Sequence, residues 1–136
     1  MINRSIVLAF DGERDNSQSV NSGIPQGSPI SPILFLIYIR FLFDRIKRKH
    51  QHVKLPSYID DVALIVEGKI TEENCKYLEQ ITKTTFQWAT ENAVTFDDSK
   101  SELIHFQKGN SEPTASVTLS NNTIINPSKT VHWLGV

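Results

Sequence analysis

Two adjacent aspartates, Asp60 and Asp61, lie between two runs of strand-forming residues. Residues 55–59 precede the pair, and the apolar residues 62–66 follow it directly. Carboxylates in such surroundings cost much free energy to bury unless a cation or hydrogen-bond donors satisfy them. The pattern therefore predicts a hairpin over residues 57–66 that carries the acid pair at its open tip.

Two interpretations of this tip are open from these residues alone. Aspartate is common in turns, so a polar hairpin tip without a further role is the simpler interpretation. Paired carboxylates at a hairpin tip could also hold a hard divalent cation for phosphoryl transfer. By themselves, the residues Tyr58-Ile59-Asp60-Asp61 favour the turn.

Composition limits the class of protein. The chain has 136 residues, of which 39% are hydrophobic, so it can form a core and corresponds to one domain or to part of a larger one. Its net charge of −1 gives no general attraction to a polyanion, so any nucleic-acid surface must be local. Cys75 is the only cysteine, which excludes an internal disulfide framework and a multi-cysteine zinc site.

The N-terminal part predicts a hairpin followed by a fixed loop. Residues 5–10 have the composition of a strand, and a second strand is expected around residues 19–21. Residues 23–32 hold three prolines and two glycines, which favours a loop of defined conformation.

A helix is expected after this loop, with Ser28-Pro29 or Ser31-Pro32 at its start. Its apolar residues recur at helical spacing, so we expect it to be mostly buried. The apolar stretch over residues 30–43 is interrupted by Arg40 and is too short to cross a bilayer.

The end of this helix is strongly basic. Residues 45–54 contain five lysines or arginines and two histidines, and they contain no acid. These cations could simply suit the negative end of the helix dipole, or they could face phosphates. The segment has no aromatic residue for base stacking, which favours the first interpretation.

A second helix is expected to be capped by Thr71, with Glu72 and Glu73 in its first turn, and to fade near Asn92. Cys75 lies on its apolar face and is expected in the core rather than as a nucleophile.

Three further β segments complete the expected fold. They are a strand over residues 102–106 after a turn at 97–100, a hairpin over residues 116–125, and a last strand from residue 131. The order of elements predicts an α+β fold, in which helices pack on one face of an antiparallel sheet.

Four segments resemble, in order, blocks of the reverse transcriptases, which are RNA-directed DNA polymerases. Residues 23–32, followed by Leu34-Phe35 and Tyr38, resemble the signature before the palm helix, and Tyr58-Ile59-Asp60-Asp61 resembles the Tyr-x-Asp-Asp box. Residues 92–106, with Lys100, resemble the next block, and Trp133-Leu134-Gly135-Val136 resembles the block at the palm–thumb junction. The first block is most similar to non-LTR, LINE-like retrotransposon polymerases of fungi.

The resemblance implies template-directed nucleotidyl transfer from a dNTP to a primer 3′-hydroxyl by two Mg²⁺ ions, with Mn²⁺ as an alternative. Asp60 and Asp61 would be the catalytic carboxylates and metal ligands. Lys100 would protonate the leaving pyrophosphate, or it is an ordinary turn lysine. The implied partners are an RNA template, a DNA primer, a dNTP and the rest of a polymerase polypeptide, with no membrane.

Contacts with nucleic acid or nucleotide are implied at the matching positions of these blocks. Gln26 would contact the template–primer or the nascent base pair, Tyr58 would lie under the primer end, and close backbone approach would occur at the loop glycines. The full set implied by the resemblance is Gly23, Pro25, Gln26, Gly27, Ser28, Tyr58, Leu134 and Gly135.

The family's remaining catalytic aspartate lies in an earlier block that these 136 residues do not contain. Asp11 follows an apolar run, but only eleven residues separate it from Gly23, so we do not expect it to be a metal ligand. The expectation is a partial reverse transcriptase domain over residues 1–136, without fingers or thumb and inactive on its own. The alternative is a non-catalytic retroelement remnant that binds nucleic acid or a longer polymerase chain. The resemblance suggests the nucleus as location, with the mitochondrion as an alternative.

Overall fold

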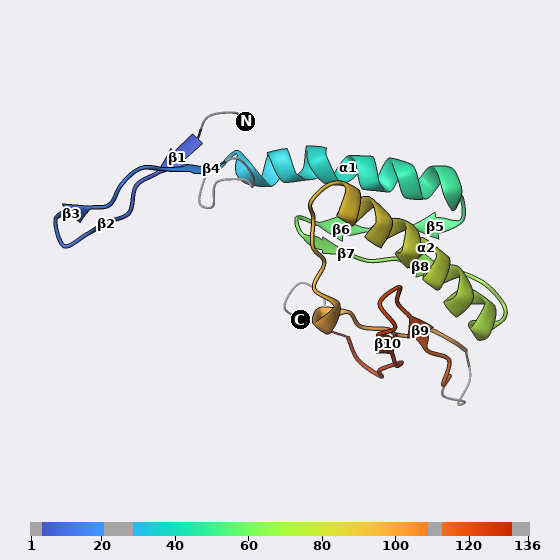
Figure 1. The fold of residues 1–136 in the computed structure, drawn as a ribbon. Coiled ribbons are helices and arrows are strands. Elements are labelled where there is room, and N and C mark those ends of the chain that lie inside the picture. Colours follow the sequence, from blue (N-terminus) through green and yellow to red (C-terminus); the bar gives the residue numbers. More distant parts are fainter. Residues whose placement is uncertain (1–3, 21–28, 109–112, 132–136) are drawn as a thin grey trace. The chain divides into compact units, whose positions relative to one another are not determined.

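The computed structural model describes residues 4–20, 29–108 and 113–131, and the chain divides into two compact units, Met1–Phe35 and Leu36–Val136. The first unit contains a β-hairpin. The second contains most of the first helix, all of the second helix and the remaining strands (Figure 1).

The hairpin of the first unit confirms the prediction for the N-terminal residues. Strand β1 (Arg4–Ile6) pairs antiparallel with β4 (Gln18–Val20), and β2 (Ala9–Phe10) pairs antiparallel with β3 (Glu13–Arg14). Asp11 and Gly12 join β2 to β3, and their φ angles are 50° and 82°. Positive φ at both central residues is the requirement of a type I′ turn, which the Asp-Gly pair meets. Asp11 is therefore an exposed turn residue.

Helix α1 (Ser31–Lys49) begins where the Ser31-Pro32 alternative placed it, but the expectation that it is mostly buried is wrong. Only Ile39, Leu42 and Ile46 are buried among its residues, and they share one face at spacings of three and four. Other large apolar side chains remain exposed, among them Phe41 at 61%. Helical periodicity predicted an apolar helix correctly. The described elements, however, cover only one part of its apolar surface, and the remaining apolar side chains stay exposed.

Helix α2 (Thr71–Glu91) runs antiparallel to α1, as their contacts show. In the middle of α1, the Tyr38 ring packs on Trp88 with a centroid distance of 5.5 Å, and the Tyr38 hydroxyl donates to the Asn92 carbonyl. At the end of α1, His50 meets Tyr77 and Thr84. The last turns of α2 therefore face the middle of α1, and the earlier turns of α2 face the end of α1, as the crossing helices in Figure 1 show.

Two polar contacts reinforce this pairing. Arg45 binds Glu91 through both carboxylate oxygens, and the hydrogen bond from Arg45 holds the pKa of Glu91 below its ordinary value. Burial, with the nearby charge of Lys49, lowers the pKa of His50. Because the Thr84 hydroxyl donates to the Gln80 carbonyl, it accepts from the neutral His50 ring at 3.1 Å.

The opposite face of α2 carries a second apolar cluster. Cys75 lies there with Leu103, Val117 and Leu119, all buried. Burial is also the main cause that raises the pKa of the Cys75 thiol, which disfavours the reactive thiolate. The prediction that Cys75 belongs to the core is confirmed.

The strands of the second unit form two-stranded antiparallel pairs. Strand β5 (Val53–Lys54) pairs with β8 (Ile65–Val66), β6 (Ser57–Tyr58) with β7 (Asp61–Val62), and β9 (Val117–Thr118) with β10 (Ile124–Ile125). Helices and small antiparallel strands are compatible with the α+β class. Among the described residues, however, no pair extends into the single sheet that was expected.

Local predictions in the C-terminal half have mixed outcomes. The hairpin over residues 116–125 is confirmed: Leu119 and Thr123 close a three-residue loop in which Asn122 has a φ of 67°. The strand over residues 102–106 is wrong, because only Leu103 forms a bridge there, parallel to Pro127. Residues 132–136 of the expected last strand lie outside the described residues.

Two further points concern the helices. Thr71 does not cap α2; the N-cap is Ile70, and it provides no side-chain hydrogen bond. The end of α2 near Asn92 is confirmed, since Asn92 is its C-cap. Within the described part of the chain, neither helix has the length and apolarity that crossing a membrane requires.

The burial pattern of α1 gives a direct test with neighbouring residues. Leu42→Ala removes a fully buried side chain and should lower the free energy of unfolding by about 2–5 kcal/mol. Phe41→Ala removes an exposed side chain and should change it by about 0.5 kcal/mol or less. Chemical denaturation of both variants measures the difference. An equal loss in both variants would contradict the observed orientation of α1.

Candidate active site

The acid pair lies at the end of a narrow antiparallel ribbon. Ser57 pairs with Val62 and Tyr58 with Asp61, so Ile59 and Asp60 form a two-residue turn. The ribbon continues away from the turn through the bond from the Ala63 amide to the Pro56 carbonyl and through the β5–β8 pair. We call residues 58–61 the acid tip; the predicted hairpin over residues 57–66 is thereby confirmed.

The turn holds a residue in an unfavourable conformation. Ile59 has a φ of 52°, in the left-handed region that β-branched residues seldom adopt. This conformation costs an L-residue about 1–2 kcal/mol, and such costs persist where the surrounding structure imposes them. Sequence reasoning missed this feature, because isoleucine by its propensity predicts extended strand rather than turn.

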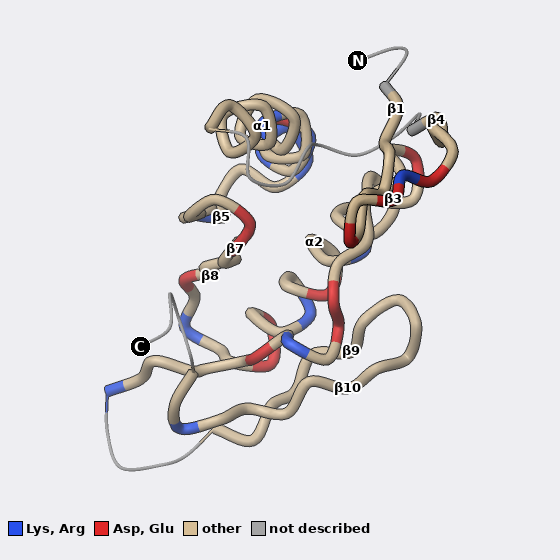
Figure 2. Tube along the Cα trace, turned by 90° about the vertical axis from the view of Figure 1, so that its left-hand side faces the viewer, with Lys and Arg blue, Asp and Glu red and all other residues tan. Residues whose placement is uncertain are grey.

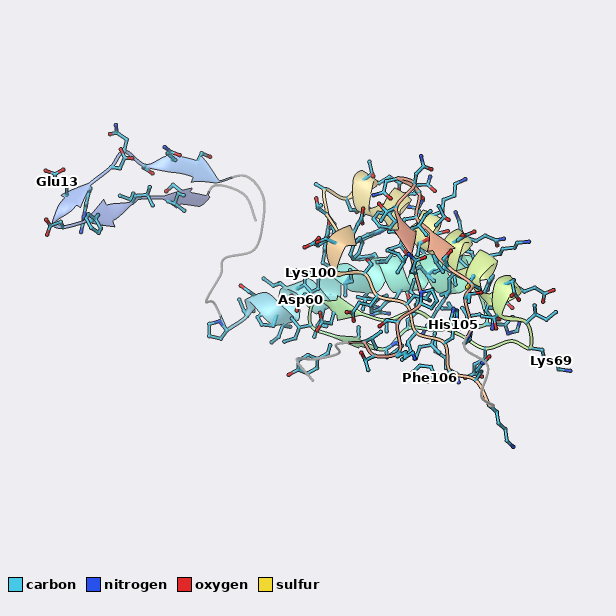
Figure 3. All side chains as sticks on the ribbon, turned by 90° about the horizontal axis from the view of Figure 1, so that it is seen from below. Glu13, Asp60, Lys69, Lys100, His105 and Phe106 are labelled. Atoms are coloured by element: carbon cyan, nitrogen blue, oxygen red, sulfur yellow. The ribbon has the colours of Figure 1, made fainter. Side chains whose placement is uncertain are left out.

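Both carboxylates of the acid tip are open to solvent. Asp60 and Asp61 are exposed, and Tyr58 is 59% exposed beside them. Figure 3 shows Asp60 at the turn end of the β6–β7 ribbon. No lysine, arginine or histidine of the described segments forms an ion pair with either aspartate. The charges are therefore available to a cation from outside the chain.

The acid tip offers carboxylate oxygens, the type of ligand that a hard divalent cation binds, but it offers too few of them for two metal ions. Carboxylate oxygens are the ligands that Mg²⁺ prefers, and two adjacent ones are present. Across residues 4–20, 29–108 and 113–131, no group of three His, Cys, Asp or Glu side chains could hold a metal ion. The acid tip can thus contribute ligands, but these residues alone do not complete a two-metal site.

Lys100 lies on a separate short helix, η1 (Asp98–Lys100), and is paired within its own turn. Its ammonium lies 3.7 Å from Asp97 Oδ2. Asp97 also accepts hydrogen bonds from the Ser99 hydroxyl and amide, and these, with Lys100, lower the pKa of Asp97. Lys100 and Asp60 are both labelled in Figure 3, and no ion pair between them is found in the described residues.

Comparison with known proteins gives the family of the chain. The sequence model of the reverse transcriptase (RNA-dependent DNA polymerase) family matches residues 1–136. The chain belongs to the reverse transcriptase family. No curated protein and no solved structure matches the chain.

Membership of the reverse transcriptase family gives the tip its chemical context. The family implies nucleic-acid and dNTP substrates, and its members generally use divalent metal ions.

Most of the other expected contact residues of this reverse transcriptase chain lie outside the described residues. These are Gly23, Pro25, Gln26, Gly27 and Ser28 in the segment before α1, and Leu134 and Gly135 near the last residue. Of the residues expected in the site, the structure therefore places Tyr58, Asp60 and Asp61 together and Lys100 in a different turn.

The strain at Ile59 can be tested with an isomeric side chain. Ile59→Leu keeps the number of apolar carbons but moves the branch away from Cβ, so part of the cost of positive φ should disappear. We expect the free energy of unfolding to rise by about 0.5 kcal/mol, measured by chemical denaturation. Ile59→Val keeps the β-branch and should bring no rise. A less stable Leu variant would contradict the assigned strain.

Proposed function

We propose that this chain is the part of a reverse transcriptase palm that carries the catalytic carboxylates, and that Asp60 and Asp61 are metal ligands for nucleotidyl transfer. The observation that supports this most is the acid tip itself: two exposed carboxylates on a turn, with no ion-pair partner among the residues that the structure describes, in a chain of this family. A turn without a role would not need Ile59 at positive φ next to them.

Each residue of the tip has a distinct part in this proposal. Asp61 is fixed by the main-chain pairing of β7 with Tyr58, so its carboxylate starts from a defined backbone position. Asp60 occupies the turn, where the conformation of Ile59 sets the direction of the backbone. Tyr58 offers an exposed ring beside the carboxylates, on which the primer end can rest. Mg²⁺ bound at these oxygens would neutralise charge on the attacked phosphate.

The proposal includes catalytic incompleteness of the 136-residue chain. Two metal ions in a fixed geometry need more carboxylate ligands than the acid tip supplies, and no third acidic side chain joins the tip in the described residues. We propose that a further carboxylate comes from another segment of a polymerase. We therefore propose that these residues are a partial domain and that they do not polymerise on their own.

Finer assignments follow from the matching blocks and are part of the proposal. The amino-acid sequence of residues 23–32 suggests a LINE-like, non-LTR retrotransposon polymerase of the fungal kind. Loop residues such as Gln26 would contact the template–primer, and Leu134 with Gly135 would hold the primer strand. Lys100 would act on the pyrophosphate only after leaving Asp97, with which it is now paired.

Primer extension tests the incompleteness. With purified chain, an RNA template, a DNA primer, dNTPs and Mg²⁺, we expect no incorporation above the background of an Asp60→Asn, Asp61→Asn double variant. Incorporation by the unchanged chain that the double variant lacks would overturn the incompleteness.

Photo-crosslinking tests the site independently of turnover. A primer with a photoreactive 3′ nucleotide, annealed to RNA, should crosslink at or beside Tyr58, and Mg²⁺ should increase the yield. In the double variant, the Mg²⁺-dependent increase should be lost. Crosslinks that map only to other segments would contradict the assignment of the acid tip to the primer end.

A further inference from the structure

The positive charge of this chain is concentrated at one end of α1. Five of its 14 lysines and arginines lie within residues 45–54, which contain no acid. Figure 2 shows such blue segments on the coils of α1. A chain with a net charge of −1 thus has a strongly basic local surface, and the proposed polymerase site does not use it.

The cations of this segment differ in their partners. Arg45 is engaged with Glu91, and Lys54 forms an ion pair with Glu67 across the β5–β8 pair. Arg48 donates from Nε to the Asp44 carbonyl, which leaves its charge without a carboxylate. Among the described residues, no ion pair is found for Lys47, Arg48 or Lys49. Three consecutive cations are therefore exposed and without an acidic partner at ion-pair distance.

The surface around these cations is hollowed. One shallow depression is lined by Asp44, Lys47 and Arg48. A second, on the turn and strand that follow the helix, is lined by Gln51, His52, Val53, Lys54 and Glu67. The two depressions follow each other along the chain, so basic side chains border hollows on both sides of the turn after α1.

The helix dipole alone does not explain this arrangement. The C-terminal end of a helix carries about half a negative charge, which one cation is enough to balance. Lys47, Arg48 and Lys49 exceed that charge several-fold, and none of the three has an ion-pair partner among the described residues. A positive potential therefore remains outside the end of α1.

We propose that Lys47, Arg48, Lys49, His52 and Lys54, the basic end, form a second nucleic-acid contact surface that binds the sugar–phosphate backbone away from the acid tip. The basic end contains no aromatic residue, so binding should depend on phosphates and be independent of base sequence.

The basic end and the acid tip are separate surfaces. Figure 1 shows the β6–β7 turn and the end of α1 at opposite ends of the strand ribbon. Lys54 and Asp60 are six positions apart in the chain, and an extended strand spans about 20 Å over six positions. The inference does not rest on the proposed function, because a chain with an inactive acid tip keeps the basic end.

Salt dependence of binding tests this surface. Fluorescence anisotropy with a labelled 20-nucleotide RNA, the DNA of the same sequence and their hybrid gives the slope of log affinity against log salt. Lys47→Ala with Lys49→Ala should weaken binding to each probe and reduce the slope by about 1.5, since each phosphate contact contributes about 0.7–0.9.

Matched variants separate this surface from a general charge effect. Lys76→Ala with Lys83→Ala removes two exposed helical lysines elsewhere and should leave the slope within about 0.5 of the unchanged chain. Lys47→Arg with Lys49→Arg should restore the affinity, which shows that charge and not loss of folding is responsible.

The probes distinguish which nucleic acid the basic end accepts. Equal affinity for RNA and DNA supports contacts to phosphate alone, and tighter binding of RNA supports additional contacts to the 2′-hydroxyl. No binding at low salt, an unchanged slope in the Lys47 and Lys49 variant, or an equal reduction in the Lys76 and Lys83 variant would overturn the proposal.

Discussion

The antiparallel contact between α1 and α2 is the constraint on which the second unit depends. Tyr38 of α1 donates to the carbonyl of Asn92 at the end of α2, and Arg45 of α1 binds Glu91 in the last turn of α2. His50, directly after α1, contacts Thr84 of α2. The strand pairs beneath them have only two residues in each strand, and isolated hairpins of this kind are marginal in water. Since α2 also contacts β8, the helices hold the ribbon whose other end is the acid tip. The geometry of the tip therefore depends on packing between helices, although none of those residues touches it.

Features determined by neighbouring residues in the chain could be predicted from the sequence. The Asp11-Gly12 turn, the start of α1 at Ser31 and the C-cap of α2 at Asn92 depend on local backbone preferences. The burial of α1 could not be predicted, because periodicity shows that a face is apolar but not whether another element covers it. The strand expected over residues 102–106 failed for the same reason, since Leu103 finds only a single bridge partner.

The candidate site also has features that the sequence could predict and features that only the structure shows. Tyr58, Asp60 and Asp61 were predicted together because a hairpin of this length places them within one turn. The positive φ of Ile59 contradicts its strand propensity, so only the structure could show it. The pairing of Lys100 with Asp97 depends on a turn that Ser99 stabilises. The resemblance of residues 92–106 to a block of the family does not specify this turn. Membership of the reverse transcriptase family supports the proposal that these exposed carboxylates bind metal, which their geometry alone does not assign.

Mn²⁺ titration of the ¹⁵N-labelled chain, followed by NMR, tests the assignment of the acid tip most directly. The chain contains a second pair of adjacent aspartates, Asp97 and Asp98, which are engaged with Ser99, Lys100 and Asn121 and serve as an internal control. If the acid tip is a metal-ligand site, paramagnetic broadening should begin at residues 59–62, before residues 97–99, and Asp60→Asn should abolish this order. Equal broadening at both acid pairs, or earlier broadening at residues 97–99, would contradict the account.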